Sequence, residues 1–205
     1  MTPRLLLPLL LLALAGCTTL PKAEMRAAAG FAEAGRAAAT SCGGSAEAAC
    51  QAIASPLLDL GGQAVAASTP DAPRHHVTLL DRGQDALIAR VHLIRAARRS
   101  IDLQSFIYDT DDTGALVLEE LLAAARRGVK VRVLLDQLYG LPDPNLQASL
   151  AGQHANFELR LYNPTFDEAK TQKLQYAAGI LCCFMKFNQR MHTKLVLVDG
   201  VAGIT

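Results

Sequence analysis

Residues 191–200 read MHTKLVLVDG, and the rest of the chain is best interpreted outward from them. The aliphatic run at residues 195–198 predicts a buried strand, and the Asp-Gly pair after it is a strong signal for a hairpin turn. Side chains alternate along a strand, so a register that extends back from this run places His192 and Lys194 on one face. A histidine and a cation on one face can both reach a single phosphate group. Asp199 lies an odd number of residues from His192, so its side chain is expected on the opposite face of the strand, where it anchors the turn.

The sequence before this run alternates between predicted strands and helices. Strands are predicted at residues 77–80, 101–108, 129–135 and 157–162, and helices at residues 85–98, 113–127 and 145–153. The pattern at residues 166–187 is ambiguous, and one interpretation is a helix followed by a substrate-facing loop. Alternation of this kind is typical of an α/β layer fold.

The pattern His-x-Lys, followed by four residues and an aspartate, resembles the signature motif of the phospholipase D superfamily. Residues 188–191, which read NQRM, look like the approach to this histidine in bacterial cardiolipin synthases of the phospholipase D type. Residues 100–108, 128–136 and 159–164 also resemble segments of that family. The resemblance covers residues 75–205 and implies a phospholipase D-like αβα domain, in which helices flank a mixed β-sheet.

The resemblance also implies transfer of a phosphoryl group in two steps through a phosphohistidine at His192. A phosphodiester is anionic, so attack on it requires neutralised charge and close positioning. His192 can be neutral and nucleophilic near neutral pH, while Lys194 can hold a phosphate oxygen. Water then gives hydrolysis, whereas an alcohol such as a glycerol headgroup gives phosphatidyl transfer. The predicted catalytic set is His192, Lys194 and Asp199, with no metal and no cofactor.

The acceptor that orients the second ring nitrogen of His192 stays open. Asp109 and Asp136 lie near predicted strand ends, where structural capping is an equally good interpretation. Acidic residues before the helix at 113–127 favour its dipole rather than an ion site. The remaining histidines are expected at surface or boundary positions: His75, His76, His92 and His154.

The chain carries one His-x-Lys motif, whereas members of the resembled family carry two or dimerise so that two meet. The second histidine protonates the leaving oxygen, which a histidine bonded to phosphorus cannot do. The family pattern also continues beyond Asp199, while this sequence stops at Thr205 within the expected return strand. We therefore expect an N-terminal half, incomplete at its C-terminus and inactive alone, that needs a second motif-bearing half or a homodimer partner.

Residues 1–16 have the features of an export signal. Arg4 precedes an apolar run at residues 5–14, which is shorter than the roughly 20 residues that span a bilayer. Residues 14–17 read LAGC and resemble a bacterial lipobox, which implies cleavage before Cys17 and lipidation of its thiol. The alternative is an ordinary signal peptide with an incidental cysteine. The expected location is the bacterial cell envelope, as a membrane-anchored lipoprotein that faces the periplasm.

The other cysteines divide into two pairs. Residues 17–74 are rich in Ala, Gly, Ser and Pro and are interpreted as a tether, in which Cys42 and Cys50 are a possible disulfide. Cys182 and Cys183 are adjacent in an apolar run and are expected to be buried thiols, because a vicinal bridge is strained. No cysteine spacing fits a zinc site.

Charge is nearly balanced, with 20 basic and 19 acidic residues, and this disfavours nucleic acid as a partner. The resemblance and the expected lipid anchor imply phosphodiester chemistry on a phospholipid substrate at a membrane. Two alternatives remain: a dimerising single-motif phosphodiesterase or nuclease, and a catalytically incomplete envelope lipoprotein fragment.

Overall fold

The computed structural model describes residues 54–205 of the chain. Its elements, in order, are α3 (Pro56–Ala66), α4 (Gly83–Ala96), β1 (Ser100–Ser105), α5 (Asp112–Arg126), β2 (Lys130–Asp136), α6 (Pro144–Ala151), β3 (Phe157–Tyr162), the 3-10 helix η2 (Thr165–Asp167), α7 (Lys173–Phe187), β4 (Leu195–Val198) and β5 (Ala202–Ile204). The export signal, the lipidation expected at Cys17 and the possible Cys42–Cys50 bridge lie outside the described residues.

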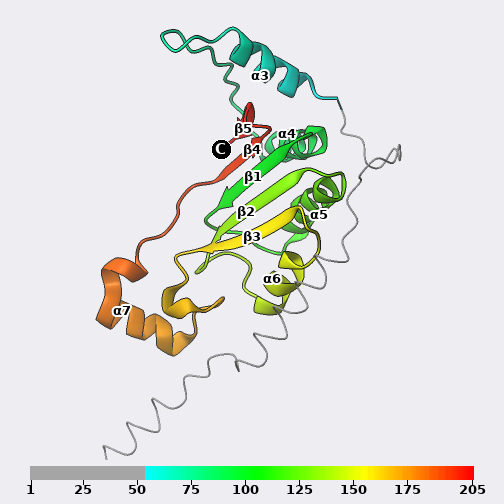
Figure 1. Ribbon diagram of the computed structural model, residues 1–205. Coiled ribbons are helices and arrows are strands. Elements are labelled where there is room, and N and C mark those ends of the chain that lie inside the picture. Colours follow the sequence, from blue (N-terminus) through cyan, green and yellow to red (C-terminus); the bar gives the residue numbers. More distant parts are fainter. Residues whose placement is uncertain (1–53) are drawn as a thin grey trace, which may run out of the picture.

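One mixed sheet has the strand order β3-β2-β1-β4-β5 (Figure 1). β1, β2 and β3 run parallel, and α5 and α6 form the crossovers between them, whereas β4 runs antiparallel to both β1 and β5. In the register of β1 and β4, Gln104 lies opposite Leu195. The end of β1 is therefore beside the start of β4, where the His-x-Lys motif lies.

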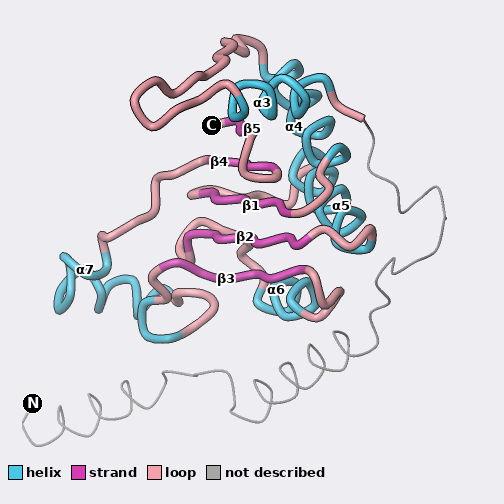
Figure 2. Tube along the Cα trace, turned by 45° about the horizontal axis from the view of Figure 1, so that its top comes forward, coloured by secondary structure: helices cyan, strands magenta, loops and turns pink. Residues whose placement is uncertain are grey.

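Helices α4, α5 and α6 pack against one face of this sheet (Figure 2). Alternate residues of the strands point into that core, such as Ile101 and Leu103 in β1, and Leu121 of α5 is fully buried against them. On the other face, Arg132 forms an ion pair with Asp102 across β2 and β1. The predicted α/β class, with a mixed sheet and flanking helices, is confirmed.

The strand predicted at residues 77–80 is wrong. These residues form neither strand nor helix, and Val77 and Leu79 are 91% and 87% exposed. A short apolar run becomes a strand only when it finds a free sheet edge. The sheet order β3-β2-β1-β4-β5 leaves the outer edges of β3 and β5 free, but residues 77–80 pair with neither.

The two adjacent cysteines also depart from expectation, because α7 bends at Cys183, where φ is −141° and ψ is 33°. The structure joins Cys182 to Cys183 in a disulfide, and Cys182 is exposed. The prediction of two buried thiols is therefore wrong. The bend takes Cys183 out of helical geometry and brings the two sulfurs together.

His154 is buried rather than a surface residue, with 3% of its area exposed. Its Nδ1 accepts a hydrogen bond of 3.1 Å from the backbone amide of Asn156, in the turn between α6 and β3. A polar side chain that satisfies a backbone donor can be buried at low cost, which the sequence pattern did not reveal. The other described histidines, His75, His76 and His92, are exposed as expected.

Candidate active site

His192 and Lys194 meet at the ring of Phe106, just after β1. The imidazole stacks on this ring with 4.6 Å between centroids, and Lys194 Nζ lies 5.8 Å from the same centroid. Lys194 Nζ also donates to the carbonyl oxygen of His192 at 3.4 Å. Both side chains are exposed, so one anionic group can approach both from solvent.

The strand was expected to extend back through Lys194 and His192 and so to place both on one face. Instead, β4 begins only at Leu195. The shared ring of Phe106 brings the two side chains together instead. Phe106 in turn lies edge-on to Tyr139, with 4.9 Å between ring centroids. Sequence reasoning did not single out Phe106, because an aromatic residue at a strand end is ordinarily a core residue.

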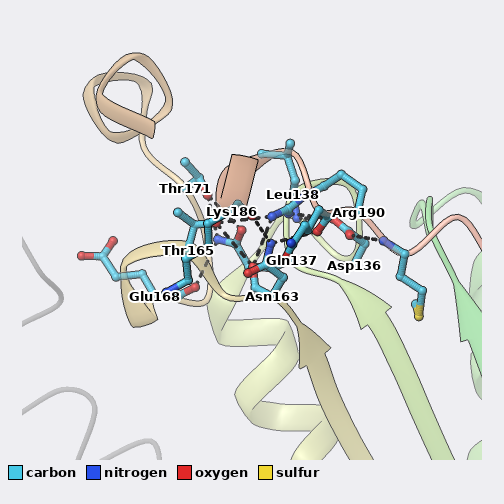
Figure 3. A network of polar contacts seen from close by, with 11 residues as sticks. Asp136, Gln137, Leu138, Asn163, Thr165, Glu168, Thr171, Lys186 and Arg190 are labelled. Atoms are coloured by element: carbon cyan, nitrogen blue, oxygen red, sulfur yellow. Dashed lines mark hydrogen bonds and ion pairs between the residues drawn. The ribbon is translucent and has the colours of Figure 1, made fainter. Parts of the chain in front are cut away.

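A buried network holds the chain just before His192 (Figure 3). Asp136, the last residue of β2, is fully buried, and its carboxylate accepts from the Arg190 guanidinium at 3.1 Å and the Met191 amide at 3.0 Å. The side-chain amide of Asn163, just after β3, donates to the carbonyl oxygens of Lys186 and Gln189 at 2.7 and 2.9 Å. The carboxyl ends of two parallel strands therefore fix the approach to the motif.

The contacts of Asp136 and Asp109 show whether either carboxylate orients the imidazole of His192. Asp136 holds the backbone one residue before His192 and not the imidazole itself. Asp109 accepts from the adjacent amide of Thr110 at 2.7 Å, so its contact is local. The role of Asp136 had a sequence signal, since an acidic residue ends a buried strand, but its partner Arg190 could be recognised only in the fold.

Asp199 fixes the motif from the other side. Its carboxylate accepts from the backbone amides of Arg98, Arg99 and Ser100 at 3.0, 2.8 and 2.9 Å, so it ties the turn after β4 to the start of β1. Its φ of 52° lies in the left-handed region, which aspartate and asparagine tolerate better than most residues. This contact is the anchoring role expected for Asp199, and it leaves the carboxylate away from His192.

Replacing Asp199 with alanine should lower the free energy of unfolding by about 2–3 kcal/mol, because three amide donors lose their acceptor. Asp199→Asn keeps one acceptor oxygen and the left-handed preference, so it should cost roughly half as much. Urea denaturation of the two variants measures the difference. Equal stability of wild type and Asp199→Ala would show that the turn does not depend on this carboxylate.

A cavity of about 400 Å³ adjoins Lys194, between the ends of β1 and β4 and the start of α5. This is within the usual size of small-ligand pockets. Tyr108 lines it and donates its hydroxyl to the Gly114 carbonyl at 2.8 Å, and burial raises the pKa of Tyr108, so the phenol stays neutral. Asp111 caps α5 by accepting from the Gly114 amide at 2.7 Å, which agrees with the expected helix-start role of the acidic cluster.

Within residues 54–205, no three His, Cys, Asp or Glu side chains gather closely enough to hold an ion. The site consists of an imidazole, an ammonium and the ring between them, with the buried carboxylate of Asp136 before the segment and the partly exposed carboxylate of Asp199 after it.

Comparison with known proteins places this arrangement in a family. An uncharacterized protein of Helicobacter pylori strain J99 is 39% identical over 150 residues, which cover 73% of this chain and 29% of that protein. Cardiolipin synthase C of Escherichia coli K12 is 38% identical over 125 residues, covering 61% of this chain and 25% of the relative. Cardiolipin synthase B of the same strain is 32% identical over 124 residues, covering 60% and 27%.

The chain therefore spans between a quarter and a third of the length of these relatives. The family model described as "Cardiolipin synthase, PLD-like domain" matches residues 91–205, which include every strand of the sheet, Phe106 and the His-x-Lys motif. The chain belongs to this family, within the phospholipase D superfamily of phosphodiesterases and phosphatidyltransferases.

Proposed function

We propose that this domain transfers phosphatidyl groups, or hydrolyses phosphodiesters, on phospholipids through a phosphohistidine at His192. The observation that carries the proposal is the convergence of His192 and Lys194 on Phe106, with both side chains exposed. An attacking nitrogen and a charge-neutralising ammonium are the two groups that a phosphodiester requires first.

In the first step, a ring nitrogen of His192 forms a bond to phosphorus while the bond from phosphorus to the leaving alcohol breaks. Lys194 neutralises charge on a phosphoryl oxygen during this step. In the second step, water or an alcohol attacks phosphorus and the bond to His192 breaks. Asp136 and Asp199 act as positioning residues that hold the segment at its two ends.

The leaving oxygen needs a proton from a second histidine. We propose that this comes from a second motif-bearing half or from a homodimer partner, and that no metal or cofactor takes part. A lipidated Cys17 would tether the domain to a membrane of the bacterial envelope, facing the periplasm, which is where phospholipid substrate is concentrated. Relatives named as cardiolipin synthases support this choice of substrate.

The competing functions are a nuclease-like phosphodiesterase and a catalytically incomplete envelope fragment. Two activated substrates separate them: phosphatidyl-p-nitrophenol and thymidine 5′-p-nitrophenyl phosphate. Nitrophenolate leaves without protonation, so neither substrate requires the second histidine. We expect kcat/KM for the lipid to exceed that for the nucleotide at least tenfold. The opposite preference would indicate a nuclease, and release from neither substrate would indicate an incomplete site.

A further inference from the structure

Helix α7 exposes large apolar side chains that the fold does not cover. Leu174 and Leu181, seven residues apart on one face of the helix before its bend, are 68% and 87% exposed, and Met185, after the bend at Cys183, is 78% exposed. Ile180 and Phe184 beside them are about half exposed. In both views α7 stands clear of α4, α5 and α6 (Figures 1 and 2). Large exposed apolar side chains concentrated on one element ordinarily mark an interaction site.

The residues around this apolar surface are basic. Residues 169–198 contain five basic side chains and no acidic one, although the whole chain is nearly neutral. Of the five, Arg190 pairs with buried Asp136, whereas Lys170, Lys173 and Lys186 are exposed and form no ion pair with any residue in the described range. Apolar side chains flanked by uncompensated lysines complement a surface that is apolar within and anionic outside.

The inner side of α7 is fixed to the site. Phe187 is 5% exposed and lies edge-on to Tyr176, with 5.1 Å between centroids, so the two parts of the bent helix pack together. A Cβ added at Gly179 would come within 2.7 Å of the Phe187 ring, so only glycine fits there. The Arg190 guanidinium lies 5.5 Å from the Phe187 ring centroid and continues the contact to Asp136.

We propose that α7 binds the interface of a bilayer that contains anionic phospholipid. Its apolar side chains enter the boundary between headgroups and acyl chains, and the lysines contact lipid phosphates. As a 15-residue helix with exposed apolar side chains and flanking lysines, α7 would lie in the interface plane. Within residues 54–205, no helix has the length and apolarity needed to cross a bilayer. His192 follows Phe187 closely, so α7 holds it near the phosphodiesters; this last step rests on the proposed phospholipid chemistry.

A single tryptophan tests the proposal directly, because the chain contains none. Leu181→Trp places a reporter on the exposed side of α7, and Leu79→Trp, at an equally exposed position outside α7, is the matched control. The full chain is mixed with phosphatidylglycerol vesicles, some carrying brominated acyl chains. We expect the emission of the Leu181→Trp protein to shift to the blue and to be quenched by bromine, while the control remains unchanged. The emission of each variant reports only the surroundings of its inserted tryptophan. Attachment of the N-terminal segment to the vesicle would therefore not by itself change the signal from position 181.

Two results would overturn the proposal. Emission at position 181 could remain solvent-like on anionic vesicles, or it could be blue-shifted before vesicles are added. In the second case another part of the protein, or a second copy if the shift depends on concentration, would cover α7.

The charge dependence is tested with Lys170→Gln, Lys173→Gln and Lys186→Gln in the Leu181→Trp protein. Each substitution should weaken binding to phosphatidylglycerol vesicles by about fivefold, and binding of the Leu181→Trp protein with all three lysines should fall sharply on phosphatidylcholine vesicles. Unchanged affinity would remove the lysines from the interaction. His192→Ala should leave insertion intact, so loss of nitrophenolate release with normal insertion would count only against the proposed function.

Discussion

Replacing His192 with alanine is expected to lower kcat/KM for phosphatidyl-p-nitrophenol about 10³-fold or more, because the group that bonds to phosphorus is gone. The substitution should leave folding intact, since His192 is exposed and its only described ring contact is with Phe106. Nitrophenolate release and urea denaturation, measured on the same protein, separate the two effects.

His92→Ala is the matched control for this variant. His92 is an exposed histidine on α4, away from the motif, so its loss should change neither activity nor stability. Full activity in His192→Ala would remove His192 from the mechanism. A parallel fall in the urea midpoint would show instead that the imidazole stabilises the fold.

Asp136→Ala should have the largest effect on stability, lowering the free energy of unfolding by about 3–5 kcal/mol. The substitution leaves the guanidinium of Arg190, itself only 9% exposed, without its ion-pair partner and deprives the Met191 amide of its acceptor. Because that amide directly precedes His192, activity should fall as well, even under conditions in which the variant remains folded. Urea denaturation followed by circular dichroism gives the change in free energy.

Asp102→Ala is the matched control, because it also removes an aspartate that pairs with an arginine. The Asp102–Arg132 pair lies on the open face of the sheet, where solvent screens it, so the urea midpoint should barely move. Equal losses for Asp102→Ala and Asp136→Ala would contradict the view that burial makes the Asp136 contact important.

Much of the fold could be predicted because its signals are local. The alternating apolar residues of β1, β2 and β3 and the aliphatic run of β4 match the strands of a sheet, and the amphipathic stripe of α5 matches a helix that covers it. The run at residues 77–80 carried the same local signal and failed. Strand formation there depends on pairing with an outer strand of the sheet, β3 or β5, and that pairing is a property of the assembled topology.

The candidate site could be predicted in its residues but not in its geometry. His192, Lys194 and Asp199 stand out through their spacing, and Asp199 anchors the turn as its parity indicated. Phe106 and Arg190 were missed, because each acts through a partner distant in the sequence. The Gln104–Leu195 register is what brings Phe106 to the motif, and only the assembled sheet reveals it.

Mass spectrometry of a trapped intermediate tests the central claim most directly. The full chain is mixed with phosphatidyl-p-nitrophenol, quenched with concentrated urea at mildly alkaline pH, at which both the phosphorus–nitrogen bond to histidine and the acyl esters persist, and digested. We expect one phosphatidyl group per chain on the peptide that contains His192, and none in His192→Ala. A phosphatidyl group on any other residue, or nitrophenolate release without an adduct at His192, would contradict nucleophilic attack by this imidazole.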